Sequence, residues 1–282
     1  MAKKTSRARQ QRALLAAQTL RILERGRYTN ADGRVVDIND AIDRAVRGTQ
    51  LVAPDTTPRR IAPVTTATTI TLKNETTLQA GRRLVEQENR DVVILNFASA
   101  KNPGGGFLNG SQAQEESLAR SSGLYVCLYG SPMYALNRRR KDPTYSHHMI
   151  YSPGVPVFRD DVGRLLPQDW RSAFITSPAV NAGVARKRGV STRRINSLMK
   201  ERAHRLLRLG AQHGHRTVVL GAWGCGVFRN DPSMVANMFL DLLQGELAGL
   251  YESAHFAVYD TRNGRFISAF RAALGDAADQ GA

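Results

Sequence analysis

The chain has 282 residues, of which 42% are hydrophobic and 23% are charged, as is ordinary for a soluble globular protein. Its 40 Lys and Arg residues outnumber 24 Asp and Glu residues, and the resulting net charge of +16 favours polyanionic partners. Two cysteines exclude a disulfide framework, and no apolar run approaches the ~18 residues that cross a bilayer. The basic N-terminus has no apolar stretch behind it, so we expect a cytoplasmic protein without a secretory signal.

The first sixty residues are expected to form an accessory extension. Apolar residues at helical spacing predict a helix over residues 6–25 that ends at Gly26. Asp32 and Gly33 predict a hairpin over residues 28–38, and a short helix is expected over residues 40–46. Residues 54–63 are rich in Pro, Thr and Arg and are typical of a linker. We therefore divide the chain into an extension (1–60), a catalytic domain (61–274) and a disordered tail (275–282).

Beyond residue 60, predicted strands and helices alternate. Apolar runs indicate strands at residues 64–72, 91–97, 149–158, 173–177, 217–221 and 255–259. Helical patterns cover residues 77–89, 192–213 and 263–274, and a further helix opens at Asp231 and Pro232, a cap followed by proline. This order predicts an α/β fold in which helices cover both faces of a mixed sheet.

One glycine-rich loop follows the strand at residues 91–97. Gly104, Gly105 and Gly106 are separated by seven residues from Gln114, Glu115 and Glu116. Consecutive glycines let backbone N–H groups approach a phosphate or sugar, and adjacent carboxylates supply proton-transfer chemistry. Ser111 and Gln114 match a capping box, which predicts a helix that carries both glutamates in its first turn. Taken alone, the glycines are more typical of a flexible turn, and the glutamates of plain capping electrostatics.

A second glycine-containing loop follows the strand at residues 217–221. Gly224, Cys225 and Gly226 lead into the helix at Asp231, and a strand, a loop and a helix N-terminus together can bind an anion. The loop lacks the third glycine of a dinucleotide fingerprint and the Gly-Lys of a Walker loop, so a plain turn with Trp223 and Phe228 in the core explains it equally well. Together, two such loops could clamp a diphosphate.

The segment from Asn96 to Glu116 resembles the signature of poly(ADP-ribose) glycohydrolases in their shorter, microbial form. The resemblance implies a macrodomain-like fold, extended at its N-terminus, and an enzyme that hydrolyses ribose–ribose O-glycosidic bonds from chain ends and releases ADP-ribose. It implies that Glu116 is the general acid and then the base, while Glu115 positions the ribose hydroxyls. We expect Glu116 to be partly buried and to titrate above a free glutamate, because desolvation and a neighbouring carboxylate both disfavour its charge.

The resemblance also implies a set of substrate-binding residues. The triple glycine and Gln114 belong to it, and Asn96, Ser99 and Asn102 lie where they could hold the distal ribose. In the second loop, Gly224, Cys225 and Gly226 would grip the diphosphate, and Val227 and Phe228 would close the pocket beside the reacting ribose. Glu75 is a candidate for the adenine amine, with a role at a helix start as the other reading.

The expected chemistry needs acid–base groups and water, so no cofactor is implied. The six histidines show no metal-ligand spacing, and nothing beside Cys225 would activate it as a nucleophile.

The expected partners are poly(ADP-ribose) and ADP-ribosylated proteins, bound by a monomer. Basic clusters at residues 3–12, 138–141 and 186–194 would also suit nucleic acid, but no helix-turn-helix, zinc or aromatic-stacking motif supports direct binding. Three alternatives stay open: a hydrolase of mono-ADP-ribosylated protein or nucleic-acid ends, a nucleic-acid-binding protein, and a non-catalytic ADP-ribose-binding module. The intact glutamate pair argues against the last.

Overall fold

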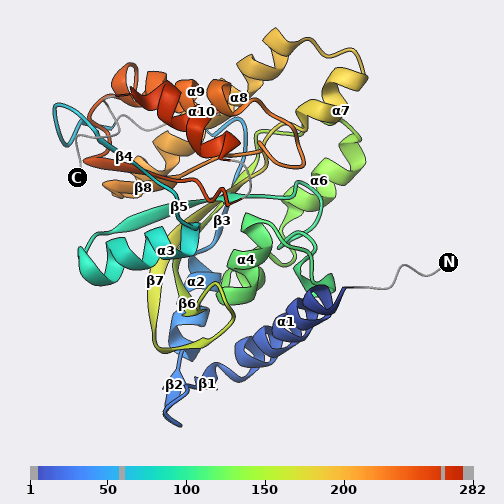
Figure 1. The fold of residues 1–282 in the computed structure, drawn as a ribbon, viewed down its shortest axis with the longest axis vertical. Coiled ribbons are helices and arrows are strands. Elements are labelled where there is room, and N and C mark those ends of the chain that lie inside the picture. Colours follow the sequence, from blue (N-terminus) through green and yellow to red (C-terminus); the bar gives the residue numbers. More distant parts are fainter. Residues whose placement is uncertain (1–5, 57–60, 262–263, 276–282) are drawn as a thin grey trace.

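A seven-stranded mixed sheet runs through the centre of the computed structural model, which describes residues 6–56, 61–261 and 264–275 (Figure 1). The strand order is β3-β6-β7-β5-β8-β9-β4. The strands are β3 (Gln50–Val52), β4 (Thr69–Lys73), β5 (Val92–Phe97), β6 (Met149–Arg159), β7 (Leu165–Ser177), β8 (Thr217–Leu220) and β9 (Ser253–Ala257). Neighbours from β7 to β4 pair in parallel, whereas β6 and β3 pair antiparallel, which confirms the expected mixed α/β sheet.

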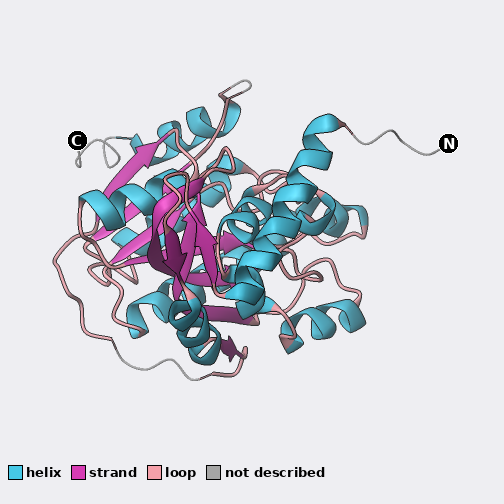
Figure 2. Ribbon diagram, turned by 90° about the horizontal axis from the view of Figure 1, so that it is seen from below, coloured by secondary structure: helices cyan, strands magenta, loops and turns pink. Residues whose placement is uncertain are grey.

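Helices cover both faces of this sheet (Figure 2). One face carries α8 (Thr192–Gln212), α9 (Pro232–Gln244) and α10 (Arg265–Leu274). The other carries α3 (Thr77–Arg82), extended by η1 (Arg83–Gln87), and α4 (Gln114–Ser121), α5 (Leu124–Leu128) and α6 (Pro132–Arg140). Both faces of strand β5 are buried. Val93 and Leu95 pack into the core on the side of α8, α9 and α10, while Val92 and Ile94 pack into the core on the opposite side. A strand buried on both faces is therefore continuously apolar.

The N-terminal elements form as the sequence predicts. Helix α1 (Arg7–Arg25) ends at Gly26, whose φ of 65° is left-handed. β1 (Arg27–Thr29) and β2 (Val35–Asp37) form the hairpin, and α2 (Asn39–Gly48) follows. Strand β3 lies within the segment assigned to the extension, yet it pairs with β6 in the central sheet. The extension thus contributes an edge strand, and the domain boundary near residue 60 stays a prediction.

Several element boundaries differ from the expectation. The strand predicted over residues 64–72 begins only at Thr69, because the Val64 and Thr65 N–H groups donate to the Gly249 carbonyl instead. β7 begins at Leu165 because its first half pairs with β6 in a long hairpin. Helices α5, α6 and α7 (Ala182–Lys187) were not predicted. The expected start of the last helix at residue 263 and the tail 276–282 lie outside the described residues.

No helix among the described residues is both long and apolar enough to span a membrane.

Candidate active site

The carboxyl ends of the five parallel strands meet at a cavity of about 610 Å³. Residues that follow β4, β5, β7, β8 and β9 line it, together with the first turn of α4. In open α/β sheets this is the edge at which ligands bind, because loops and helix N-termini gather there. Both glycine-containing loops singled out in the sequence lie at this edge.

Gly105 is the contact point between the first loop and the two glutamates. Gly104 and Gly105 have φ of 66° and 59°, in the left-handed region that favours glycine. A Cβ at Gly105 would collide with Glu116 Oε1 and lie 3.1 Å from Glu115 Oε2. The neighbouring Gly106 N–H donates to Glu116 Oε1 at 2.9 Å. The glycines therefore let the loop close directly over both carboxyl groups.

Glu115 is the buried member of the pair, with 3% of its surface exposed. Its Oε2 accepts from the Ser99 N–H at 2.6 Å, and its Oε1 accepts from Asn96 Nδ2 at 3.4 Å. Burial raises the pKa of Glu115 to about 8, and the charge of Glu116 adds to this, although hydrogen bonds from Ser99, Asn96 and Gly104 oppose it. Glu115 is thus mainly a neutral carboxylic acid at pH 7.

Glu116 lines the cavity and is half-buried, which confirms the burial expected for it. Its neighbour Glu115 is buried more deeply. The cause is the direction of α4, whose first turn directs Glu115 inward against the fully buried Asn96 of β5 and Thr176 of the neighbouring β7. Glu116 is left at the cavity wall beside the glycine loop.

The predicted capping box at Ser111 is wrong. Helix α4 begins at Gln114, its N-cap is Ala113, and no side chain caps it. The Gln114 side chain turns back to β5 instead: its Oε1 accepts from the Phe97 N–H at 2.8 Å and its Nε2 donates to the Leu95 carbonyl at 2.8 Å. Nε2 also contacts Thr77 Oγ1 at 3.2 Å. Gln114 thus fastens the helix that carries both glutamates to the central strand.

The second loop offers backbone donors. Gly224 has φ of 74°, and a Cβ there would lie 2.5 Å from the Ala179 Cβ. Asn230 Nδ2 donates to the Gly224 carbonyl at 3.1 Å and to the Val180 carbonyl at 2.8 Å, which fixes the loop. The N–H groups of residues 226–228 have no acceptor among the described residues. Three consecutive free N–H groups beside a helix N-terminus favour an anion.

Comparisons with known proteins identify this arrangement. The family model described as "Microbial-type PARG, catalytic domain" matches residues 16–160. The crystal structure of poly(ADP-ribose) glycohydrolase (PARG) from Thermomonospora curvata is 48% identical, covers 94% of this chain and 99% of its own, and has a TM-score of 0.89. The chain belongs to the microbial-type PARG family. No curated protein sequence matches it.

Two further PARG structures hold ligands. The T. curvata PARG bound to the inhibitor ADP-HPD is 49% identical, with 93% of this chain and 99% of that chain covered and a TM-score of 0.87. The Deinococcus radiodurans PARG in complex with ADP-ribose is 44% identical, with 83% and 97% covered and a TM-score of 0.78. The family resemblance and the macrodomain-like fold expected from residues 96–116 are therefore confirmed.

In the second loop of this PARG-family chain, residues 224–228 all line the cavity except Cys225. Its thiol is buried with Sγ 3.8 Å from the Trp223 carbonyl oxygen, and burial raises its pKa to about 12. A thiol with that pKa is not a nucleophile at neutral pH. Val227 is 86% exposed at the rim, and Phe228 packs its ring against Tyr145 with centroids 5.8 Å apart.

Asn102 and Glu75 are not among the residues that line the cavity. Asn102 is exposed, and its carbonyl accepts from the Gly105 N–H at 3.0 Å. The Glu75 carboxylate pairs with the Arg83 guanidinium at 2.6 Å, and Arg83 also binds Glu88. Ligand contacts by Asn102 and Glu75 stay predictions.

Sequence reasoning missed several residues of the cavity wall. Thr76 and Asp161 face each other there, with Thr76 Oγ1 donating to Asp161 Oδ2 at 2.7 Å. Asp161 lies in the turn of the β6–β7 hairpin, 85 positions from Thr76, so no local pattern joins the two. Tyr259 and Phe266 add aromatic surface at the end of β9 and the start of α10. No group of three or more metal-ligating side chains occurs within the described ranges.

Proposed function

We propose that this chain hydrolyses the ribose–ribose O-glycosidic bonds of poly(ADP-ribose) from the chain end and releases ADP-ribose. Membership of the PARG family supports the reaction, and the PARG complexes with ADP-ribose and ADP-HPD support the ligand class. The observation that carries the proposal is the pair Glu115 and Glu116, folded around Gly105 at the wall of a cavity of about 610 Å³. That volume lies within the ~300–1,000 Å³ typical of small-ligand pockets.

Glu116 is the proton donor in this proposal. Its carboxyl group lines the cavity, so it can protonate the glycosidic oxygen as the bond to the anomeric carbon breaks. The leaving ribose departs as an alcohol, and the remaining sugar carries oxocarbenium character. Glu116, now a carboxylate, takes the proton of the water molecule that adds to the anomeric carbon. One carboxyl group thus acts first as acid and then as base.

Glu115 orients the sugar. Its raised pKa of about 8 keeps a proton on a carboxyl group that the Ser99 N–H and Asn96 hold in place. A neutral carboxylic acid can both donate to and accept from ribose hydroxyls, whereas a carboxylate only accepts.

The second loop binds the diphosphate. The free N–H groups of residues 226–228 are the donors, and the N-terminus of α9 adds its dipole. The N–H groups of the first loop are largely occupied, since Gly105 donates to Asn102 and Gly106 donates to Glu116. The triple glycine therefore shapes the catalytic wall more than it holds phosphate.

The rim of the cavity supports exo-cleavage. Val227, which is 86% exposed, and Phe228 both line the cavity, and in this proposal their side chains close it beyond the reacting ribose. A polymer could then enter only with its terminal unit. We infer that the chain acts as a monomer on polymer attached to ADP-ribosylated proteins.

Product analysis tests this function. The wild type and Glu116→Gln are incubated with polymer attached to an automodified protein, and the released products are separated by size. We expect monomeric ADP-ribose as the first product of the wild type and none from the variant, which still binds polymer. Early release of oligomers would refute exo-cleavage, and release of only the last protein-bound unit would favour the mono-ADP-ribosyl hydrolase.

A further inference from the structure

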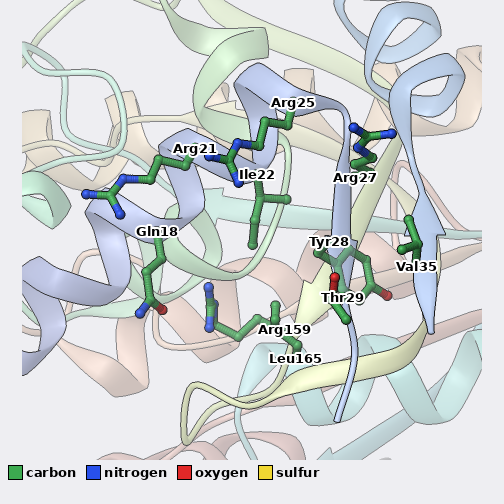
Figure 3. A pocket seen from close by; sticks show the side chains of 10 residues that line it. All are labelled: Gln18, Arg21, Ile22, Arg25, Arg27, Tyr28, Thr29, Val35, Arg159 and Leu165. Carbon is green, nitrogen blue, oxygen red and sulfur yellow. The ribbon is translucent and has the colours of Figure 1, made fainter. Parts of the chain in front are cut away.

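A second cavity, of about 490 Å³, lies between α1, the β1–β2 hairpin and the turn end of the β6–β7 hairpin (Figure 3). Four arginines line it: Arg21 and Arg25 from α1, Arg27 from β1 and Arg159 from β6. None of the described residues that line the cavity carries a carboxyl group. Its wall therefore holds four positive charges without a compensating acid.

Arg159 is the central observation. Only 3% of its surface is exposed, and Nη1 donates to the Gly163 carbonyl at 2.7 Å, which fixes the guanidinium. Nε and Nη2 have no hydrogen-bonding partner among the described residues. Figure 3 shows the guanidinium directed into the space beneath α1, towards Gln18. Buried guanidinium groups are normally paired, because an unpaired buried charge is strongly unfavourable.

No carboxylate among the described residues is hydrogen-bonded to the Arg159 guanidinium. The neighbouring Asp160 carboxylate attracts it electrostatically, but the ion pair of Asp160 is with Arg164, at 2.8 Å. The side chains of Arg21, Arg25 and Arg27 are exposed and form no ion pair within the described parts of the chain. Tyr28 also lines the cavity, and its buried hydroxyl has no hydrogen-bonding partner among the described residues. The cavity thus gathers donors from three elements and presents no strong acceptor.

We propose that this cavity is a subsite for a diphosphate group of the poly(ADP-ribose) chain, outside the unit held in the active site; the assignment rests on the proposed function. Arginine forks match phosphate oxygens bidentately, and four arginines around one cavity favour a doubly charged group. The C-terminal end of α1 lies nearby, and its dipole weakly disfavours an anion, but four cations exceed that effect.

The turn of the β6–β7 hairpin lies between the two cavities. Arg159 lines the basic cavity, while Asp161, two residues later, lines the active site. Helix α1 joins the same two places: its Leu15 packs on Gly163 of this turn, and its Arg9 and Arg12 donate to the Asn109 and Gly110 carbonyls after the triple glycine, both at 2.9 Å. A polymer that leaves the active site across this turn would reach the basic cavity.

The shape of the cavity favours the polymer over nucleic acid. Proteins that bind single-stranded nucleic acid track the backbone along a groove and stack bases on aromatic platforms. Here the four arginines border one cavity rather than following a groove, and the only aromatic lining residue among those described is the buried Tyr28. Such a cavity holds one phosphate-bearing group, as a neighbouring unit of the polymer would supply.

Binding in the Glu116→Gln background tests the proposal without turnover. The affinities for polymer of defined length and for monomeric ADP-ribose are measured with Arg21→Gln/Arg25→Gln, with Arg159→Met and with a control, Arg139→Gln/Arg193→Gln. The control removes two exposed arginines elsewhere on the surface. We expect the two cavity variants to weaken polymer binding at least ~tenfold and to leave monomer binding within about twofold. The control should bind both ligands like its parent.

The affinity for pyrophosphate gives a second test, which does not depend on the proposed function. It should bind the wild type and lose affinity in Arg21→Gln/Arg25→Gln, a surface variant that spares the buried Arg159. Unchanged polymer and pyrophosphate affinities in that variant would overturn the subsite, as would an equal loss in the control. Tighter binding of single-stranded DNA than of polymer through these arginines would assign the cavity to nucleic acid instead. Failure of the wild type to cleave polymer would refute the proposed function but not pyrophosphate binding.

Discussion

Gly105 and Glu116 lie so close together that position 105 accepts no side chain. A Cβ at this position would collide with the Glu116 carboxyl group, and the left-handed φ of 59° independently disfavours any other residue. The carboxyl group that we assign as the proton donor is therefore packed against bare backbone. Its position depends on the glycine loop as much as on its own helix.

Gly105→Ala should abolish activity out of proportion to its effect on stability. We expect kcat to fall at least ~100-fold, because a displaced acid loses most of its contribution to catalysis. Gly130→Ala is the matched control, since Gly130 has φ of 81° and nothing within 4 Å of its would-be Cβ. Both variants should lose ~1 kcal/mol of unfolding free energy from backbone strain. Equal activities in the two would show that the contact with Glu116 is unimportant.

The raised pKa of Glu115 makes stability depend on pH. Folded Glu115 keeps its proton up to about pH 8, whereas the unfolded chain releases it near pH ~4.3. The unfolded state therefore binds fewer protons between these values, and the stability that the neutral acid contributes below pH ~4.3 is lost as pH rises to 8. Glu115→Gln cannot titrate and should lack this loss, which is on the order of 1 kcal/mol per pH unit.

Urea unfolding of the wild type and Glu115→Gln at several pH values between 4.5 and 9 measures this difference. The two proteins are compared by how steeply the free energy of unfolding changes with pH, so a pH-independent effect of the amide on packing does not enter. Parallel curves would contradict the assignment of the raised pKa to Glu115.

Gln114 attaches helix α4, which carries both glutamates, to strand β5. Gln114→Ala removes its hydrogen bonds to Phe97, Leu95 and Thr77 and should lower the unfolding free energy by ~1–3 kcal/mol. We expect kcat to fall as well, because α4 loses its attachment to β5. Gln244→Ala, at an exposed position of α9, should change neither quantity. If Gln114→Ala weakened only ADP-ribose binding and left stability intact, Gln114 would be a ligand contact instead.

Cys225 should be dispensable for chemistry. Its buried thiol has a pKa of about 12, so we expect Cys225→Ala to retain kcat within ~threefold of the wild type. Cys127→Ala, at the other buried thiol, is the control for a small loss of packing. A loss of ~100-fold or more in Cys225→Ala, with ADP-ribose affinity intact, would point to a nucleophilic cysteine.

Local patterns predicted those elements whose signals are local. The apolar run of β5 and the Asp231-Pro232 start of α9 both formed as expected, because burial on two faces and helix capping act within a few residues. The capping box at Ser111 failed because Gln114 found better partners on β5, which is 19 positions away from it at Leu95. Tertiary hydrogen bonds outweighed a local rule.

Non-local contacts set the rest of the site. The sequence places Glu115 and Glu116 side by side but does not reveal which one faces the core, since this depends on how α4 lies against β5. The pairing of Gln50 with Tyr151 joins segments 101 residues apart (151 − 50), and the contact of Thr76 with Asp161 spans 85. No periodicity in either segment predicts such pairs.

The central claim is that Glu116 donates the proton to the glycosidic oxygen. The most direct measurement is kcat on poly(ADP-ribose) for Glu116→Gln, together with the affinity of the same protein for ADP-ribose by calorimetry. The account predicts a fall in kcat of at least ~100-fold with the dissociation constant for ADP-ribose changed by less than ~threefold. A variant that retained kcat within ~tenfold of the wild type would contradict it.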